Sequence, residues 1–95
     1  MKIAQIAPLT EKVPPEKYGG TERVVSTLTE GMVRRGHEVT LFASGDSKTS
    51  AKLFASYPKN LRETIPTNQP ARHALRNMHL GLAYSHQDEF DIIHD

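Results

Sequence analysis

The first half of the chain alternates between short apolar runs and one long amphipathic stretch. Residues 2–7 (KIAQIA) are almost continuously apolar, which is typical of a strand in a parallel sheet that helices cover on both faces. Over residues 21–35, apolar side chains recur at intervals of one, three and four, which predicts a helix with one apolar face. Residues 37–43 (HEVTLFA) predict a second strand. A strand–helix–strand unit of this length crosses over right-handed, so we expect the two strands to pair in parallel.

The predicted helix carries signals at both ends. Thr21 can cap its first peptide N–H groups, and Gly36 is well placed as the left-handed residue that ends it. Gly31 costs about 1 kcal/mol relative to alanine inside a helix, and we expect it to let the helix approach the sheet closely. The residues of the expected core face are Val24, Val25, Leu28, Met32 and Val33.

The second half of the chain is less regular. Residues 48–70 are poorly patterned, although residues 51–57 could form a short edge strand. Pro70 fits the first position of a second helix that ends at about His86, and residues 90–95 resemble the opening of another strand. The expected apolar side of the second helix consists of Ala71, Ala74, Leu75, Met78, Leu82 and Tyr84. These elements together predict an α/β fold, a Rossmann-like parallel sheet with flanking helices.

Three histidines punctuate the second predicted helix. His73, His79 and His86 are six and seven residues apart, whereas metal-binding pairs on a helix are usually three or four residues apart. We therefore expect these histidines to be exposed or to pack against a partner, and we predict no metal site.

Composition narrows the function classes. The chain has 95 residues, enough for one small domain. Its 12 basic and 11 acidic residues leave a net charge of +1, which argues against a nucleic-acid or membrane partner bound by charge. With no cysteine, it has neither a disulfide framework nor thiolate chemistry. It also lacks a signal peptide or membrane span, so we expect a soluble, cytoplasmic protein.

The candidate site is the loop that joins the first strand to the first helix. It ends in Gly19 and Gly20, and a helix that starts there presents N–H groups without internal partners and about half a positive charge. Glycine also lets a phosphate or carboxylate approach the backbone, so we expect a ligand site at Gly19, Gly20 and Thr21. An ordinary turn is the alternative interpretation.

Two acidic residues belong to the same hypothesis. Glu22 would repel a phosphate placed close by, but it can accept hydrogen bonds from sugar hydroxyls. Asp46 follows the second strand in the polar loop 44–47, at the edge where parallel sheets bind ligands. Asp46 could bind a hydroxyl in the same crevice, and an ordinary turn aspartate is an equally good interpretation.

Two motifs, GGTERVV (residues 19–25) and RRGHEVTLF (34–42), occur in order with MKIA (1–4) before them and FDIIH (90–94) after them. In this order the chain resembles the N-terminal domain of retaining glycosyltransferases of the glycogen-synthase and sucrose-synthase-like superfamily. Those enzymes have the GT-B architecture, in which two Rossmann-like domains face a deep cleft. The resemblance implies transfer of a sugar from a nucleotide-sugar donor to an acceptor with retention, and it implies no cofactor.

The resemblance also implies roles for single residues. Gly19 and Gly20 correspond to the loop that approaches the donor diphosphate or the acceptor, and Lys17 resembles a lysine that reaches the sugar nucleotide. His94 matches the first histidine of an H-x-H motif whose second histidine would lie beyond Asp95, so no catalytic residue is assigned.

The nucleotide-holding second domain of such enzymes has no counterpart in residues 1–95. We therefore expect a fragment that is inactive alone and that associates with itself or with the missing domain. Two other hypotheses remain: a small flavodoxin-like module that binds a phosphate or nucleotide, and a structural piece that oligomerises to complete its sheet.

Overall fold

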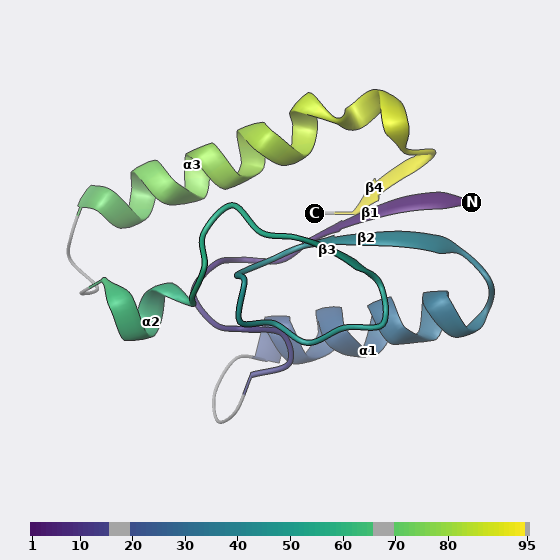
Figure 1. The fold of residues 1–95 in the computed structure, drawn as a ribbon, viewed down its shortest axis with the longest axis horizontal. Helices are drawn as coiled ribbons and strands as arrows, with labels where there is room; N and C mark the ends of the chain where they lie inside the picture. Colours follow the sequence, from purple (N-terminus) through teal and green to yellow (C-terminus); the bar gives the residue numbers. More distant parts are fainter. Residues whose placement is uncertain (16–19, 66–69, 95) are drawn as a thin grey trace.

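The structure is a computed structural model that describes residues 1–15, 20–65 and 70–94. Figure 1 shows the elements along the chain. In order they are β1 (Lys2–Ile6), α1 (Gly20–Arg34), β2 (Glu38–Phe42), β3 (Lys52–Phe54), α2 (Leu61–Thr64), α3 (Pro70–Ser85), a short 3-10 helix η1 (Gln87–Glu89) and β4 (Ile92–His94).

All four strands form one parallel sheet in the order β3-β2-β1-β4. β1 pairs with β2 over its whole length, from Lys2 opposite Glu38 to Ile6 opposite Phe42. On its other edge β1 pairs with β4, and Gln5 lies opposite His94. The predicted parallel pairing of the first two strands is confirmed, and so is the α/β fold class.

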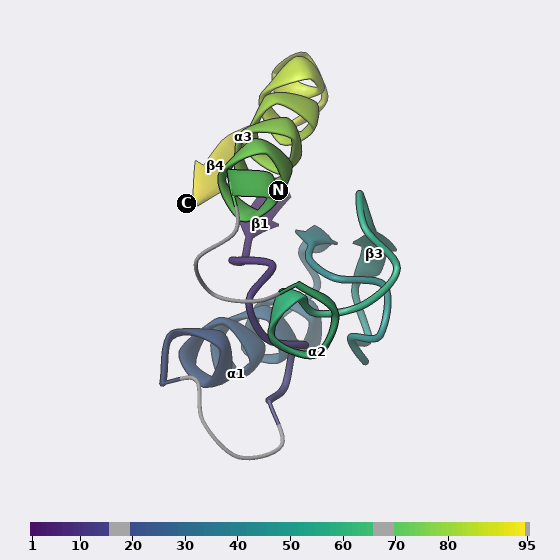
Figure 2. The ribbon, with the colours of Figure 1, turned by 90° about the vertical axis from the view of Figure 1, so that its left-hand side faces the viewer.

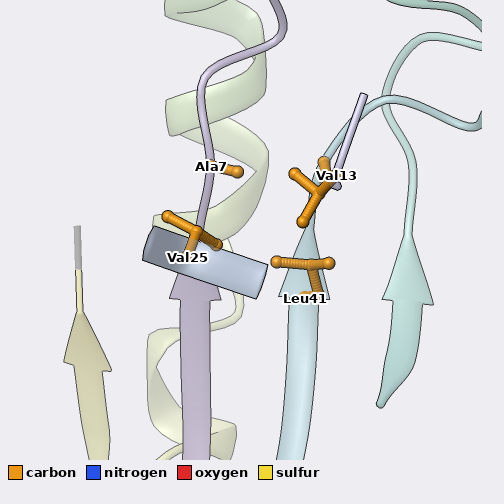
Figure 3. Close-up of a cluster of buried hydrophobic side chains, with 5 residues drawn as sticks. Ala7, Val13, Val25 and Leu41 are labelled. Carbon is orange, nitrogen blue, oxygen red and sulfur yellow. The ribbon is translucent and has the colours of Figure 1, made fainter. Parts of the chain in front are cut away.

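The sheet lies between two long helices. Figure 2 shows α1 on one side of the sheet and α3 on the other. Ala4 and Ile6 of β1 pack in a cluster with Ala83 of α3, whereas Ala7, directly after the strand, packs with Val25 of α1. Ile3 and Gln5, which alternate with Ala4 and Ile6 along β1, are buried as well. Figure 3 shows Val25 with Ala7, Leu41 and the loop residue Val13 in this second cluster. The prediction that the first strand is buried on both faces is therefore confirmed.

The boundaries of α1 confirm one sequence signal and overturn another. Gly36 has a φ of 88° and donates to the Val33 carbonyl at 3.0 Å, while His37 donates to the Met32 carbonyl at 3.2 Å. These two bonds make the glycine-terminated helix end that was predicted. The predicted cap at Thr21 is wrong, because the helix already begins at Gly20.

The expected core face of α1 is largely wrong. Val25 is buried, but Val24 is 57% exposed and Leu28 is 43% exposed. Glu22 and Thr29 occupy the buried positions on either side of Val25. The helix therefore lies on the sheet along the stripe 22–25–29, and the neighbouring side chains of Val24 and Leu28 are left exposed.

The expected face of α3 is also wrong in part. Its buried residues are Arg72, His79 and Ala83, whereas the predicted core residues Met78 and Tyr84 are exposed. His79 contradicts the expectation of an exposed or partner-packing histidine. Arg72 can be buried because its guanidinium donates to the carbonyls of Leu61, the first residue of α2, and Ile65, which follows its last residue, at 3.1 and 2.9 Å.

The described residues contain neither a membrane-spanning helix nor a cluster of metal ligands. Within those ranges, no helix has the length and apolar character needed to cross a bilayer. Nor do the described histidines and carboxylates include a group of three or more that could hold a metal ion.

The glycines provide a test of the backbone. A Cβ at Gly45 would lie 2.8 Å from the Pro58 carbonyl oxygen, which is backbone and cannot move aside easily. A Cβ at Gly31 would meet only the flexible guanidinium of Arg34, at 4.0 Å, so the expectation that Gly31 permits close packing on the sheet is wrong. We expect Gly45→Ala to lower the free energy of unfolding by about 1–3 kcal/mol and Gly31→Ala to raise it by up to about 1 kcal/mol.

Urea unfolding of the two variants and the wild type, followed by circular dichroism, measures both changes. A Gly45→Ala variant as stable as the wild type would contradict the close contact with Pro58.

Candidate functional site

A cleft of about 1020 Å³ opens where β1 and β4 end, between the start of α1 and the middle of α3. The strand order of the sheet reverses at this point. β2 and β3, which follow β1 in the chain, lie on one side of β1, whereas β4 lies on its other side. Ligands of open parallel sheets bind in such crevices, beyond the carboxyl ends of the strands. The topology thus selects this cleft among the hollows of the described surface.

The first turn of α1 contributes the backbone donors. Gly20 and Thr21 are exposed and both line the cleft. N–H groups in the first turn of a helix have no internal acceptor, and the helix dipole makes this end positive. Gly19 and Lys17 lie outside the described residues, so of the predicted loop contacts the structure places Gly20 and Thr21.

Glu22 is the most unusual side chain of the cleft. It lines the cleft, yet it is only 6% exposed. Among the described residues its carboxylate has no hydrogen bond or ion pair. The oxygens of Glu22 are not among the buried side-chain atoms that lack a hydrogen-bond partner, so they remain open to the cleft. A carboxylate oxygen only accepts hydrogen bonds. Glu22 therefore places a hydrogen-bond acceptor in the lining of the cleft, and its contact with sugar hydroxyls stays a prediction.

His79 lies on the opposite side of the cleft and is 3% exposed. Its Nε2 is 2.9 Å from the Ala7 carbonyl oxygen, which can only accept, so Nε2 carries a proton. Its Nδ1 is 2.8 Å from the Ser56 hydroxyl, which donates to it when the ring is neutral. His79 thus ties α3 to the end of β1 and to the segment after β3.

His94 closes the cleft at the end of β4. Its Nδ1–H donates to Gln5 Oε1 at 2.8 Å, across the register pair that joins β4 to β1. In a neutral ring with this tautomer, Nε2 remains an acceptor. Arg76 of α3 adds a cation to the lining.

Comparison with known families decides the assignment. Residues 18–95 match the family model described as Glycosyltransferase Family 4. The chain belongs to this family. The match takes in every element from α1 to β4, and with it the resemblance to glycosyltransferases is confirmed at the level of the superfamily. A search of curated proteins found no match.

Asp46 lies apart from the cleft of this Family 4 chain. It is not among the cleft-lining residues, and its oxygens accept hydrogen bonds from the Ser44 hydroxyl at 2.6 Å and the Asn60 side-chain amide at 2.8 Å. Asn60 in turn caps α2 by accepting from the Glu63 N–H. The structure therefore separates Asp46 from Gly20 and Thr21, which the sequence hypothesis had put in one crevice.

The surroundings of Asp46 also set its acidity. Partial burial alone would raise the pKa of this carboxyl, but the hydrogen bonds from Ser44 and Asn60 outweigh it and lower the pKa below its usual value. A lowered folded-state pKa stabilises the fold above the unfolded pKa, and this stabilisation is lost as the pH falls through the folded value.

Two cleft residues of the Family 4 chain escaped the sequence hypothesis as site residues. His79 and Arg76 belong to a helix whose docking angle the sequence does not reveal, and no motif marks them. In the sequence, these two residues are marked only as polar positions in the periodic stretch 70–86. That signal is weak, because polar residues also occupy the solvent-exposed faces of helices.

The pH dependence gives a second test. At neutral pH we expect Asp46→Ala to lower the free energy of unfolding by at least about 1 kcal/mol, because the donors on Ser44 and Asn60 lose their charged acceptor. At a pH below about 3.8, the usual value for the group, the difference should shrink as the wild-type carboxylate protonates. Urea unfolding at both pH values measures it, with Asp88→Ala as a control at an exposed carboxylate. An Asp46→Ala effect that is the same at both pH values would contradict the hydrogen-bonded carboxylate.

Proposed function

We propose that this chain is the acceptor-side part of a glycosyltransferase that transfers a sugar from a nucleotide-sugar donor to an acceptor with retention of configuration. The family match over residues 18–95 is the observation that carries the proposal. The cleft at the strand-order reversal supports it, because it is large enough for a sugar-containing ligand and has polar groups from α1, α3 and β4 in its lining.

In this proposal the described residues act by positioning. The first-turn N–H groups at Gly20 and Thr21, with Gly19 and Lys17 before them, contact the donor diphosphate or the acceptor. Glu22 accepts hydrogen bonds from sugar hydroxyls. Glycosyl transfer from a nucleotide sugar gains from alignment of the two substrates and from stabilising the departing diphosphate, so it does not need the carboxylate pair of a glycosidase. Asp46 is left out, since its carboxylate already accepts hydrogen bonds inside the protein.

A second domain completes the proposed enzyme. In the related GT-B enzymes, the nucleotide is held by a basic residue on the diphosphate and a carboxylate on the ribose, both from the second domain. We propose that residues 1–95 need such a domain for turnover.

Two preparations test the transferase proposal. The 95-residue chain alone, mixed with UDP-glucose or GDP-mannose and simple sugar acceptors, should form no glycoside. A chimera that joins this chain to the nucleotide-binding domain of another Family 4 enzyme should form one with retained anomeric configuration, read from the coupling constant of the anomeric proton.

Turnover by the isolated chain would refute the need for a second domain. A chimera that folds and binds nucleotide sugar, yet transfers nothing to any acceptor, would contradict the transferase proposal. Glu38 lies at the amino-terminal ends of the paired strands β1 and β2, whereas the cleft lies beyond the carboxyl ends. A chimera with Glu38→Gln is therefore the control, and it should transfer sugar as well as the unchanged chimera does.

Self-association is a second part of the proposal. β4 is the last strand of the sheet order, and Ile92 on it is 44% exposed. A strand edge with apolar side chains tends to pair with another chain. Figure 2 shows β4 at one end of the sheet and β3 at the other.

We expect the chain to sediment as a dimer or larger assembly at tens of micromolar, and Ile92→Lys to shift it towards monomer, because a charge on the edge opposes pairing. Analytical ultracentrifugation measures both. Lys59 is exposed and lies outside every strand, so Lys59→Gln is the control that should leave the assembly unchanged. A monomeric wild type would contradict pairing through β4.

A further inference from the structure

Exposed apolar side chains line the same cleft as Glu22. Val24 and Leu28 are one helical turn apart on α1, and they are 57% and 43% exposed. Leu80 of α3 is 36% exposed. All three line the cleft together with Glu22. The cleft therefore combines polar groups at the start of α1 with an apolar wall of Val24, Leu28 and Leu80, in addition to the polar residues of α3 and β4 described above.

The polar end makes a specific demand on a ligand. The Glu22 carboxylate only accepts hydrogen bonds, whereas the first-turn N–H groups at Gly20 and Thr21 only donate. A hydroxyl satisfies both, because it donates to the carboxylate and accepts from an N–H. A diphosphate would satisfy the N–H groups but would be repelled by Glu22, and an ammonium group would meet the positive end of the helix dipole. The chemistry at this end thus matches neutral hydroxyls.

We propose that the cleft binds the acceptor and that this acceptor is an amphiphile, a hydroxyl-bearing head joined to an alkyl or aromatic part. The head lies at Glu22 and the first turn of α1, and the apolar part lies against Val24, Leu28 and Leu80. The volume of about 1020 Å³ accommodates a sugar or polyol together with such a group. The role of this ligand as an acceptor rests on the proposed transferase function, whereas the binding of an amphiphile to the cleft does not.

The binding test uses the 95-residue chain and three soluble probes in amide NMR titrations. The probes are p-nitrophenyl β-glucoside, which has head and apolar part, glucose, which has the head alone, and inorganic pyrophosphate. We expect saturable shifts over residues 20–28 and 76–80 with the aryl glucoside, at least about tenfold tighter than with glucose, because the ring buries apolar surface of the cleft. Pyrophosphate should bind weakly or not at all.

Matched variants separate the two ends of the cleft. Glu22→Gln keeps the shape but weakens the acceptor, so both glucose and the aryl glucoside should bind about tenfold more weakly. Leu80→Ala should weaken the aryl glucoside and leave glucose unchanged. Met78→Ala is the control for Leu80, because Met78 is 43% exposed on the same helix and does not line the cleft. Circular dichroism shows whether each variant folds.

Three results would overturn the proposal. One is pyrophosphate binding at Gly20 and Thr21 in preference to the glucosides, and another is equal affinity for glucose and the aryl glucoside. The third is concentration-dependent shifts of Val24, Leu28 and Leu80 without any probe, since a second copy of the chain would then occupy the cleft. If the probes bind with the expected pattern but the chimera is inactive, the transferase function is refuted and the binding site is supported. If the chimera is active but prefers aryl or alkyl glycosides no more than free sugars as acceptors, the proposed amphiphile site is refuted and the transferase function is supported.

Discussion

β1 is hydrogen-bonded along both edges, and four of its five residues are buried. The positions of β2 and β4, and of the cleft beyond their ends, depend on this double pairing. Because β2 and β4 run parallel to β1, their carboxyl ends meet at one edge of the sheet, where the chain also turns towards α1. Carbonyl groups at the end of β1 need hydrogen-bond donors from outside the sheet. The Ala7 carbonyl, directly after the strand, accepts from Nε2 of His79.

Hydrogen bonds that involve the buried side chains of Gln5 and Arg72 hold neighbouring elements together. His94 donates to Gln5 and thereby joins β4 to β1, while Arg72 joins α3 to the end of α2. Withdrawing such groups from water is unfavourable unless each finds a partner, so these bonds favour one arrangement of the helices over sliding alternatives. Among the described residues, Gln5 Nε2 and Thr29 Oγ1 are buried without a hydrogen-bond partner.

Asp46 and Glu22 show how similar residues serve different purposes. Both are acidic and lie near the carboxyl edge of the sheet, but Asp46 accepts from Ser44 and Asn60, whereas Glu22 accepts from no described residue. The hydrogen bonds of Asp46 lower its pKa and hold the loop after β2 to α2. A carboxylate that gains nothing from the fold is the better candidate for a ligand contact, which is why Glu22 and not Asp46 belongs to the proposed acceptor site.

The sequence by itself determined the strand–helix–strand unit, its parallel pairing, the end of α1 at Gly36 and the family motifs at the start of α1. Each of these follows from local patterns, since periodicity, a glycine with positive φ and a right-handed crossover need no knowledge of distant residues. Only the tertiary structure decided which stripe of each helix is buried. Periodicity shows which residues share a face, but the angle at which a helix docks depends on side chains far along the chain. The docking of α1 placed Val24 and Leu28 in the lining of the cleft, and the docking of α3 buried His79 against the end of β1. The hydrogen bonds of Asp46 to Ser44 and Asn60, which also join separate parts of the chain, were likewise decided by the tertiary structure.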